Sequence, residues 1–150
     1  MPKIVIDTNI GFSGMLNTNS NIGKILIEGR QFYEFFAPDF LKEELFKYKS
    51  KIKIIAKYNE SKFDDIFLLL FGHVTFIDHR ILQDEIYYYA EKLCKHIDED
   101  DTNFVALNEY VQGRIWTGDL KLIKGLAYAG YTRCVKTADL LQEFKLKINK

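Results

Sequence analysis

The chain has 150 residues, 47% hydrophobic and 28% charged, so it is long enough to bury a core without disulfides or a structural metal. Its 21 basic and 21 acidic residues cancel, which counts against a strongly basic nucleic-acid-binding domain without excluding local basic patches. The apolar run Ile4–Ile6 is too short for a signal peptide, and Ile66–Phe71, the longest apolar stretch, is too short to cross a bilayer. We therefore expect one soluble, cytoplasmic domain over residues 1–150.

The first elements alternate strand and helix. Lys3–Ile6 is a short run of β-branched residues, typical of a strand buried on both faces. After Asp7-Thr8-Asn9, the residues Gly11-Phe12-Ser13-Gly14 predict an irregular connection. A helix is predicted from Ser20 or Asn21, with Gly29 as its stop, followed by a strand at Phe32–Phe36.

A long helix is predicted from Asp39. At about 100° per residue, five apolar residues share a stripe roughly 80° wide; they are Leu41, Leu45, Tyr48, Ile52 and Ile55. Glu44 lies about 20° beyond the edge of this stripe, whereas Glu43 points roughly 160° from its centre. We therefore expect Glu44 to border the core and Glu43 to face water.

The second half repeats the alternation. Predicted helices cover Ser61–Phe71 (with Ser61 as its cap), Leu82–Ile97, Thr102–Val111, Asp119–Ala129 and Thr137–Phe144, and Ile86, Tyr89, Ala90 and Leu93 share one face of the second. Predicted strands are Val74–Ile77, Arg114–Thr117 and Arg133–Lys136. Strands separated by helices indicate βαβ units, and hence a mostly parallel sheet of about five strands with helices on both faces.

Carboxylates recur where ligands bind in such folds. Asp7 and Asp119 follow predicted strands, Asp101 lies in the first turn of a helix, and Glu44 lies at a helix edge. Ligands of open parallel sheets bind beyond the carboxyl ends of the strands, so these four acids are expected to converge. Packed carboxylates repel unless a cation compensates them. An oxygen-only set suits Mg²⁺ or another hard divalent ion, and such a site suits phosphodiester hydrolysis.

Each acid alone has a simpler interpretation. Asp7 is typical of a turn that ends a strand, Asp119 of an N-cap, and Glu44 of a helix surface. The run Asp98–Asp101 is typical of helix capping. Only their joint placement in one topology favours a site.

Four segments, in order, resemble the PIN domain family of metal-dependent ribonucleases. The segments are Asp7-Thr8-Asn9 with Phe12-Ser13-Gly14, Glu44-Leu45, Asp101-Thr102-Asn103-Phe104-Val105-Ala106-Leu107, and Trp116-Thr117-Gly118-Asp119. The resemblance covers nearly the whole chain and implies a three-layer α/β/α fold. It also implies that Asp7, Glu44, Asp101 and Asp119 are the catalytic, metal-binding acids.

Further expectations rest on this resemblance. Asp98 is expected to reach the metal through water, Asp100 to act as a cap, and Asn9 and Thr117 to support the acids by hydrogen bonds. The implied activity is a Mg²⁺- or Mn²⁺-dependent endoribonuclease acting on RNA. Family membership further suggests the toxin of a toxin–antitoxin pair, with a small antitoxin protein and a second copy of the chain as candidate partners.

Two other functions could use such a fold. A non-catalytic PIN-like module would bind RNA or a protein partner, but such a module would be expected to lack one or more of the acids. A phosphatase or receiver domain would need a lysine partner for its aspartate, and no motif supplies one.

Two other surface features have ordinary explanations. The basic run Lys47, Lys49, Lys51, Lys53 and Lys57 could guide RNA phosphates, but a solvated helix face is favoured. Tyr87-Tyr88-Tyr89 could stack on unpaired bases, but a helix spreads the three rings around its axis, which favours packing.

Overall fold

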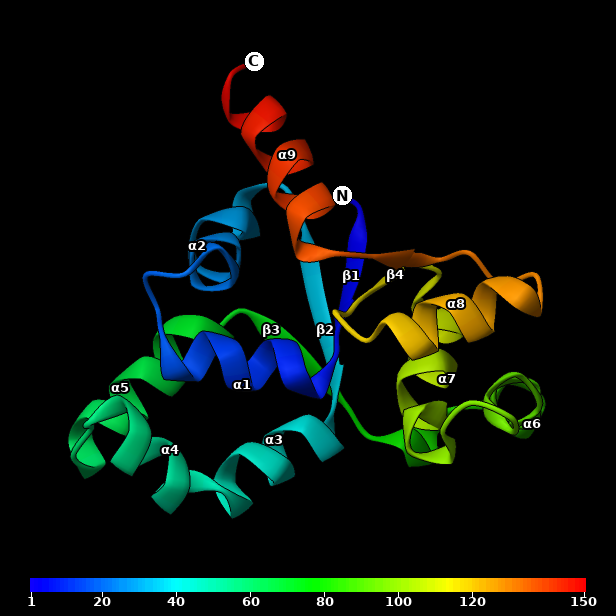
Figure 1. The fold of residues 1–150 in the computed structure, drawn as a ribbon, viewed down its shortest axis with the longest axis horizontal. Helices are drawn as coiled ribbons and strands as arrows, with labels where there is room; N and C mark the ends of the chain where they lie inside the picture. The colour runs from blue at the N-terminus through cyan, green and yellow to red at the C-terminus, as the bar shows by residue number, and fades with distance from the viewer.

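A computed structural model describes residues 1–150, with one parallel five-stranded sheet of order β3-β2-β1-β4-β5 (Figure 1). The strands are β1 (Lys3–Ile6), β2 (Glu34–Pro38), β3 (Val74–Ile77), β4 (Arg114–Trp116) and β5 (Cys134–Val135). The α-helices are α1 (Thr8–Leu16), α2 (Asn21–Glu28), α3 (Asp39–Lys47), α4 (Lys49–Ala56), α5 (Glu60–Phe71), α6 (Asp84–Cys94), α7 (Thr102–Val111), α8 (Leu120–Tyr128) and α9 (Thr137–Ile148). Short 3₁₀ turns are η1 (Gly29–Gln31), η2 (His79–Ile81) and η3 (Glu99–Asp101).

Helices cover both faces of the sheet, which confirms the predicted three-layer α/β/α fold (Figure 1). Side chains of β1 alternate between the layers because successive residues of a strand point to opposite faces. Ile4 and Ile6 join the larger core, built with α1–α5 and α9, whereas Val5 packs with Phe104 and Leu107 of α7. β1 is therefore buried on both faces, as its apolar run predicts.

The strand order places β1 at the centre of the sheet, between β2 and β4. Val5 of β1 pairs with Phe36 of β2 on one side and with Ile115 of β4 on the other. Connections from β1 run toward β2, whereas β4 continues to β5 on the opposite side, so the order reverses between β1 and β4. Clefts that bind ligands in α/β sheets form at such a reversal, beyond the carboxyl ends of the strands.

The predicted irregular connection at Gly11–Gly14 is wrong, since these residues lie within α1. Both glycines are buried at helix contacts. A Cβ at Gly11 would lie 3.3 Å from Leu41 Cδ1, and one at Gly14 would lie 3.2 Å from Leu26 Cδ1. The glycines therefore allow close packing rather than a turn, so their helix-breaking tendency does not decide the local structure.

The long helix predicted from Asp39 is broken at Tyr48, which separates α3 from α4. Tyr48 has φ −100° and ψ 18°, outside the helical range. Beyond the break, Ile52 is buried but Ile55 is 55% exposed. The predicted stripe holds only for one straight helix, so it does not continue past Tyr48. Lys49 and Lys53 of α4 both form ion pairs with Glu60 of α5, and these tertiary contacts accompany the change of direction.

Smaller differences concern one strand, helix ends and one helix face. β2 covers Glu34–Pro38 rather than the predicted Phe32–Phe36. Asn59, not Ser61, caps α5, since its Oδ1 accepts the Lys62 N–H at 2.7 Å. α6 ends at Cys94 rather than Ile97, and Tyr89 is exposed rather than part of the buried face. None of the helices combines the length and apolar character needed to cross a bilayer.

Candidate functional site

Asp7 lies at the end of β1 and is 5% exposed. Its Oδ1 accepts the Thr8 N–H at 2.8 Å at the start of α1, and its Oδ2 accepts the Thr117 hydroxyl at 2.6 Å. Burial raises the pKa of Asp7, the two hydrogen bonds oppose that rise, and the charge of Asp119 adds to it. The strand end thus holds a desolvated carboxyl in a fixed orientation.

Thr117 connects Asp7 to Asp119. It is fully buried directly after β4, and its Oγ1 both donates to Asp7 and accepts the Asp119 N–H at 3.1 Å. Asp119 in turn caps α8 by accepting the Leu122 N–H at 3.2 Å. The expected hydrogen bond from Thr117 to an acid is present, and Asp119 both acts as an N-cap and lies within the charge cluster.

Asp101 is the carboxyl with the least compensation. It ends η3 and is half-buried, and its Oδ2 is buried without a hydrogen-bond partner. Burial raises its pKa to about 7, helped by the charges of Asp7, Asp98, Asp119 and Asp100 in decreasing order. Asp7, Asp101 and Asp119 therefore belong to one electrostatic cluster at the reversal of strand order.

The predicted roles within Asp98–Asp101 need correction. Asp98, not Asp100, acts as the cap, because Asp98 Oδ1 accepts the Asp100 N–H at 2.9 Å. Asp98 is exposed, yet among the neighbouring charges only that of Asp7 has a larger effect on the pKa of Asp101. Asp98 therefore lies beside the cluster with one oxygen already used in the 3₁₀ turn.

Two predicted residues are not drawn into this cluster. Glu44 is half-buried and Glu43 exposed, as predicted, but the Glu44 carboxylate makes no hydrogen bond or ion pair. Glu44 is also absent from the charges that act on Asp7 and Asp101. Asn9 is exposed on α1 and makes no hydrogen bond to an acid.

No three Asp, Glu, His or Cys side chains of the structure approach closely enough to hold one metal ion. Asp7 and Asp119 are each directed by hydrogen bonds to backbone N–H groups, and like charges without a cation between them repel. The donor chemistry nevertheless fits a hard divalent ion. The set is all oxygen, and one buried oxygen of Asp101 has no partner.

A family model described as a PIN domain matches residues 5–144. The chain belongs to the PIN domain family. The match includes Asp7, Glu44, Asp101 and Asp119, and the all-parallel sheet agrees with it. PIN domains are generally nucleases and typically use divalent metals, which favours a nuclease for this PIN domain. No curated protein matches the chain.

One polar group of this PIN domain was missed in the sequence. Thr8 follows Asp7, and its hydroxyl is buried without a hydrogen-bond partner. The Asp7-Thr8-Asn9 segment is the only sequence signal for this group, and it does not distinguish Thr8 from Asn9, which is exposed. An unpartnered hydroxyl beside a buried carboxyl is a better candidate than Asn9 to support a ligand at this end of β1.

The acid cluster predicts an unusual pH dependence of stability. An unfolded aspartate titrates near 3.8, whereas the pKa of Asp101 in the folded protein is about 7. Protonated Asp101 therefore stabilises the fold, and this contribution is lost as pH rises from about 4 to about 7. Partial exposure of the side chain limits the loss to the order of 1–2 kcal/mol. Urea unfolding in chelator between pH 4.5 and 8 measures the effect.

The matched comparison for this prediction is Asp101→Asn, which removes the titrating group. The free energy of unfolding of the unsubstituted protein minus that of the variant is expected to fall over this pH range. A difference that stays constant from pH 4.5 to 8 would show that Asp101 ionises normally. Divalent ions are left out because a bound cation would offset the repulsion.

Proposed function

We propose that this PIN domain is an endoribonuclease that hydrolyses RNA phosphodiester bonds with Mg²⁺ or Mn²⁺. The observation that carries the proposal is the buried, unpartnered Oδ2 of Asp101 in a cluster with the charges of Asp7 and Asp119. Buried carboxylates without a counter-charge are costly, and a functional site is the common reason for retaining them. Family membership supplies the reaction class.

Asp7, Asp101 and Asp119 would hold the ion, with Asp98 reaching it through water. When bound, a divalent ion supplies a Lewis acid for the phosphoryl oxygen and lowers the pKa of a coordinated water. The chain's own groups fix the ligands. Thr117 holds Asp7 through its hydroxyl and positions Asp119 through the backbone.

Glu44 is proposed as an additional ligand that joins the set when the ion binds. It projects from α3, which begins directly after β2, the neighbour of β1. Glu44→Gln is expected to weaken Mn²⁺-dependent cleavage by about tenfold or more. It should leave the pH dependence of stability in chelator unchanged, because the Glu44 charge does not act on Asp101.

Glu43→Gln is the matched control, because Glu43 is the exposed neighbour on the same helix. Cleavage rates at a fixed Mn²⁺ concentration and urea unfolding of both variants give the comparison. Equal rates for Glu44→Gln and Glu43→Gln would remove Glu44 from the proposed ligand set.

The basic run from Lys47 to Lys57, on α4 and at its two ends, does not form a continuous phosphate track. Lys49 and Lys53 are neutralised by Glu60, with Asp64 3.6 Å from Lys49. These ion pairs leave only Lys47, Lys51 and Lys57 of the run free to attract phosphates. This arrangement agrees with the interpretation of the run as a solvated helix face.

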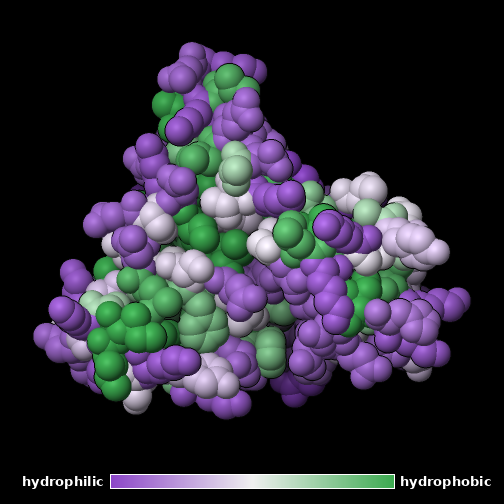
Figure 2. All heavy atoms as spheres, in the orientation of Figure 1, coloured by the Kyte–Doolittle hydropathy of each residue, from purple (hydrophilic) through white to green (hydrophobic).

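A toxin role adds two proposed partners, an antitoxin that covers the acids and a second copy of the chain. Hydrophobic side chains gather over α4 and α5, at the lower left of Figure 2. Among them, Ile54 is 78% and Leu68 is 69% exposed.

Growth arrest on expression of the unsubstituted protein, relieved by Asp7→Asn, tests the toxin role. Light scattering of the purified protein tests whether a second copy of the chain binds.

The second candidate function is a non-catalytic RNA- or protein-binding module. It is favoured by one observation, that no three acids approach closely enough to hold an ion. Cleavage of a mixed RNA substrate with Mg²⁺ or Mn²⁺, with and without chelator, separates the two candidates. We expect metal-dependent cleavage that Asp7→Asn abolishes. RNA binding without cleavage, unchanged by Asp7→Asn, would favour the binding module.

A further inference from the structure

We propose that the groove between α6 and the start of α7 binds a nucleobase of single-stranded RNA beside the acid cluster. The inference rests on the proposed nuclease function and names its substrate class. The groove encloses about 610 Å³, within the range of small-molecule sites. Its lining includes Tyr87, Tyr88, Lys92, Lys95 and Thr102.

One face of α6 forms a wall of the groove. At about 100° per residue, the side chains at positions 87, 88, 91, 92 and 95 fall in an arc of about 140° around the helix axis. Tyr89 lies outside this arc and does not line the groove. The three consecutive tyrosines therefore divide into two that face the groove and one that does not.

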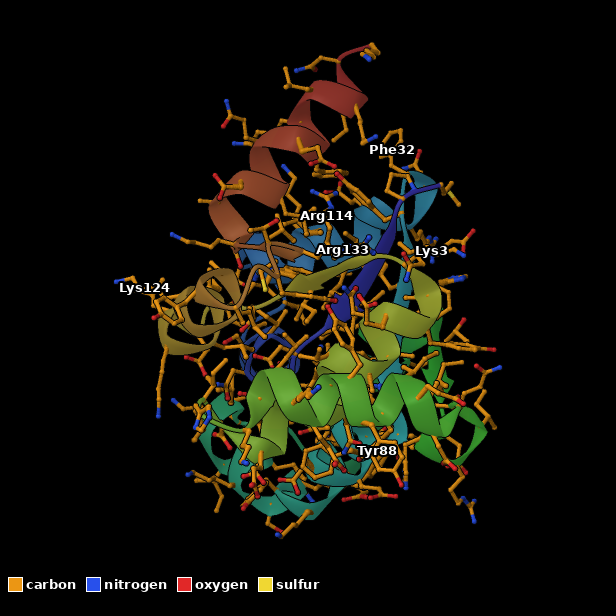
Figure 3. The ribbon with its side chains drawn as sticks, turned by 90° about the vertical axis from the view of Figure 1, so that its right-hand side faces the viewer. Lys3, Phe32, Tyr88, Arg114, Lys124 and Arg133 are labelled. Carbon is orange, nitrogen blue, oxygen red and sulfur yellow. The ribbon has the colours of Figure 1, made fainter.

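The two tyrosines of the groove differ in how they are held. The Tyr87 hydroxyl donates to Asn103 Oδ1 of α7 at 2.6 Å, which fixes the ring between the two helices. Tyr88 is 67% exposed and makes no hydrogen bond, and Figure 3 labels it on α6, on the side of the molecule facing the viewer. A ring that is free on one face suits stacking on an unpaired base, whose own faces are not covered by pairing.

Charged groups of the groove suit a nucleotide. Lys92 and Lys95 form no ion pair with any acid, so both remain available for phosphates. Glu91 and Glu99 also line the groove. Their carboxylates can accept hydrogen bonds from N–H groups on the edge of an unpaired base.

The groove adjoins the acid cluster along the chain. Glu99 and Thr102 line it, and Asp101 immediately precedes Thr102. Consecutive Cα atoms lie about 3.8 Å apart, so the backbone of the groove wall begins one residue after Asp101. A base in the groove therefore belongs to a nucleotide close to the phosphate that the acids would process.

Duplex RNA does not fit this arrangement. Bases in a helix are stacked on one another, and single-stranded RNA presents the free base faces that aromatic side chains bind. The expected substrate is thus a loop or an unpaired segment, with one base on Tyr88.

Tyr88→Ala and Tyr89→Ala form a matched pair that tests the inference, since both rings are exposed neighbours on α6 and only Tyr88 lines the groove. Fluorescence anisotropy with a labelled single-stranded RNA of mixed sequence, in chelator, gives the dissociation constants. Tyr88→Ala is expected to weaken binding about tenfold and Tyr89→Ala to leave it unchanged. Tyr88→Trp keeps a stacking ring and should bind as the unsubstituted protein does.

Cleavage kinetics separate this inference from the nuclease proposal. In Mn²⁺, Tyr88→Ala is expected to raise KM about tenfold with kcat unchanged, because the ring binds substrate without touching the reacting atoms. Metal-dependent cleavage with identical KM for Tyr88→Ala and Tyr89→Ala would overturn the base site and leave the nuclease intact. Binding that depends on Tyr88 without any cleavage would support the base site and overturn the nuclease. Absence of single-stranded RNA binding by the unsubstituted protein would overturn the base site.

Discussion

Asp101→Asn is expected to lower divalent-ion-dependent RNA cleavage by about 100-fold or more and, in chelator, to make the protein more stable. Both effects come from the same side chain. The Asp101 carboxyl is half-buried, one of its oxygens has no partner, and burial, helped by the charges of neighbouring aspartates, raises its pKa to about 7. Removing the charge removes the repulsion that an ion would otherwise offset, and it also removes a ligand.

The stability gain should depend on pH. Above about pH 7 Asp101 is ionised, so Asp101→Asn is expected to raise the melting temperature by a few degrees, corresponding to the order of 1–2 kcal/mol. Near pH 4.5 the carboxyl is protonated and the gain should vanish. Asp100→Asn is the matched control, because Asp100 is exposed and its charge has the smallest effect of the four on the pKa of Asp101. A destabilised Asp101→Asn protein at pH 8 that still cleaves RNA would contradict both expectations, the gain in stability and the loss of cleavage.

Thr117→Val is expected to destabilise the protein by about 2–3 kcal/mol and to reduce metal-dependent cleavage 10- to 100-fold. Valine fills nearly the same volume but has no hydroxyl. The substitution leaves the buried Oδ2 of Asp7 without its donor and the Asp119 N–H without its acceptor. Loss of a hydrogen bond to a buried charge is among the costlier single changes in a protein.

Thr117→Ser separates the hydroxyl from the methyl group at this position. Serine keeps the donor to Asp7, so most of the cleavage activity should return, at a smaller cost in stability from the lost methyl. Urea unfolding and cleavage rates in Mn²⁺ give both quantities for the two variants. If Thr117→Val cleaves RNA as fast as Thr117→Ser, the hydroxyl does not position the acids.

The sheet was predictable from the sequence because its strands are short runs with clear chemistry. Lys3–Ile6 and Val74–Ile77 were predicted with the bounds found, since short runs rich in β-branched and aromatic residues between turns mark strands. The helix at Thr102–Val111 was also predicted with its observed bounds. Local pattern and tertiary structure agree at these elements.

Elements governed by tertiary contacts were not predictable. Gly11 and Gly14 carry the local signature of a loop, yet they lie in α1 because Leu41 and Leu26 pack against them. The break at Tyr48 has no proline or glycine to mark it, and α4 is tied to α5 by ion pairs to Glu60. Single-residue propensity cannot anticipate a helix whose direction depends on a distant segment.

The candidate site divides in the same way. Asp7 and Asp119 follow β1 and β4, whose ends share one edge of the parallel sheet, and the hydroxyl of Thr117 joins them, while their role as metal ligands stays a prediction. The hydrogen-bonding role within Asp98–Asp101 was misassigned, because neighbouring aspartates are chemically equivalent until the 3₁₀ turn selects one as its cap. Glu44 stays a prediction, since its distance from the other acids depends on the course of α3.

Anomalous diffraction from crystals grown with Mn²⁺ is the sharpest test of the proposed metal site, because manganese can be located without reference to activity. We expect an anomalous peak coordinated by Asp7, Asp101 and Asp119, and its loss in crystals of Asp101→Asn. Crystals of a protein that cleaves RNA in Mn²⁺, with no peak at these carboxylates or with a peak elsewhere on the molecule, would contradict the proposed site.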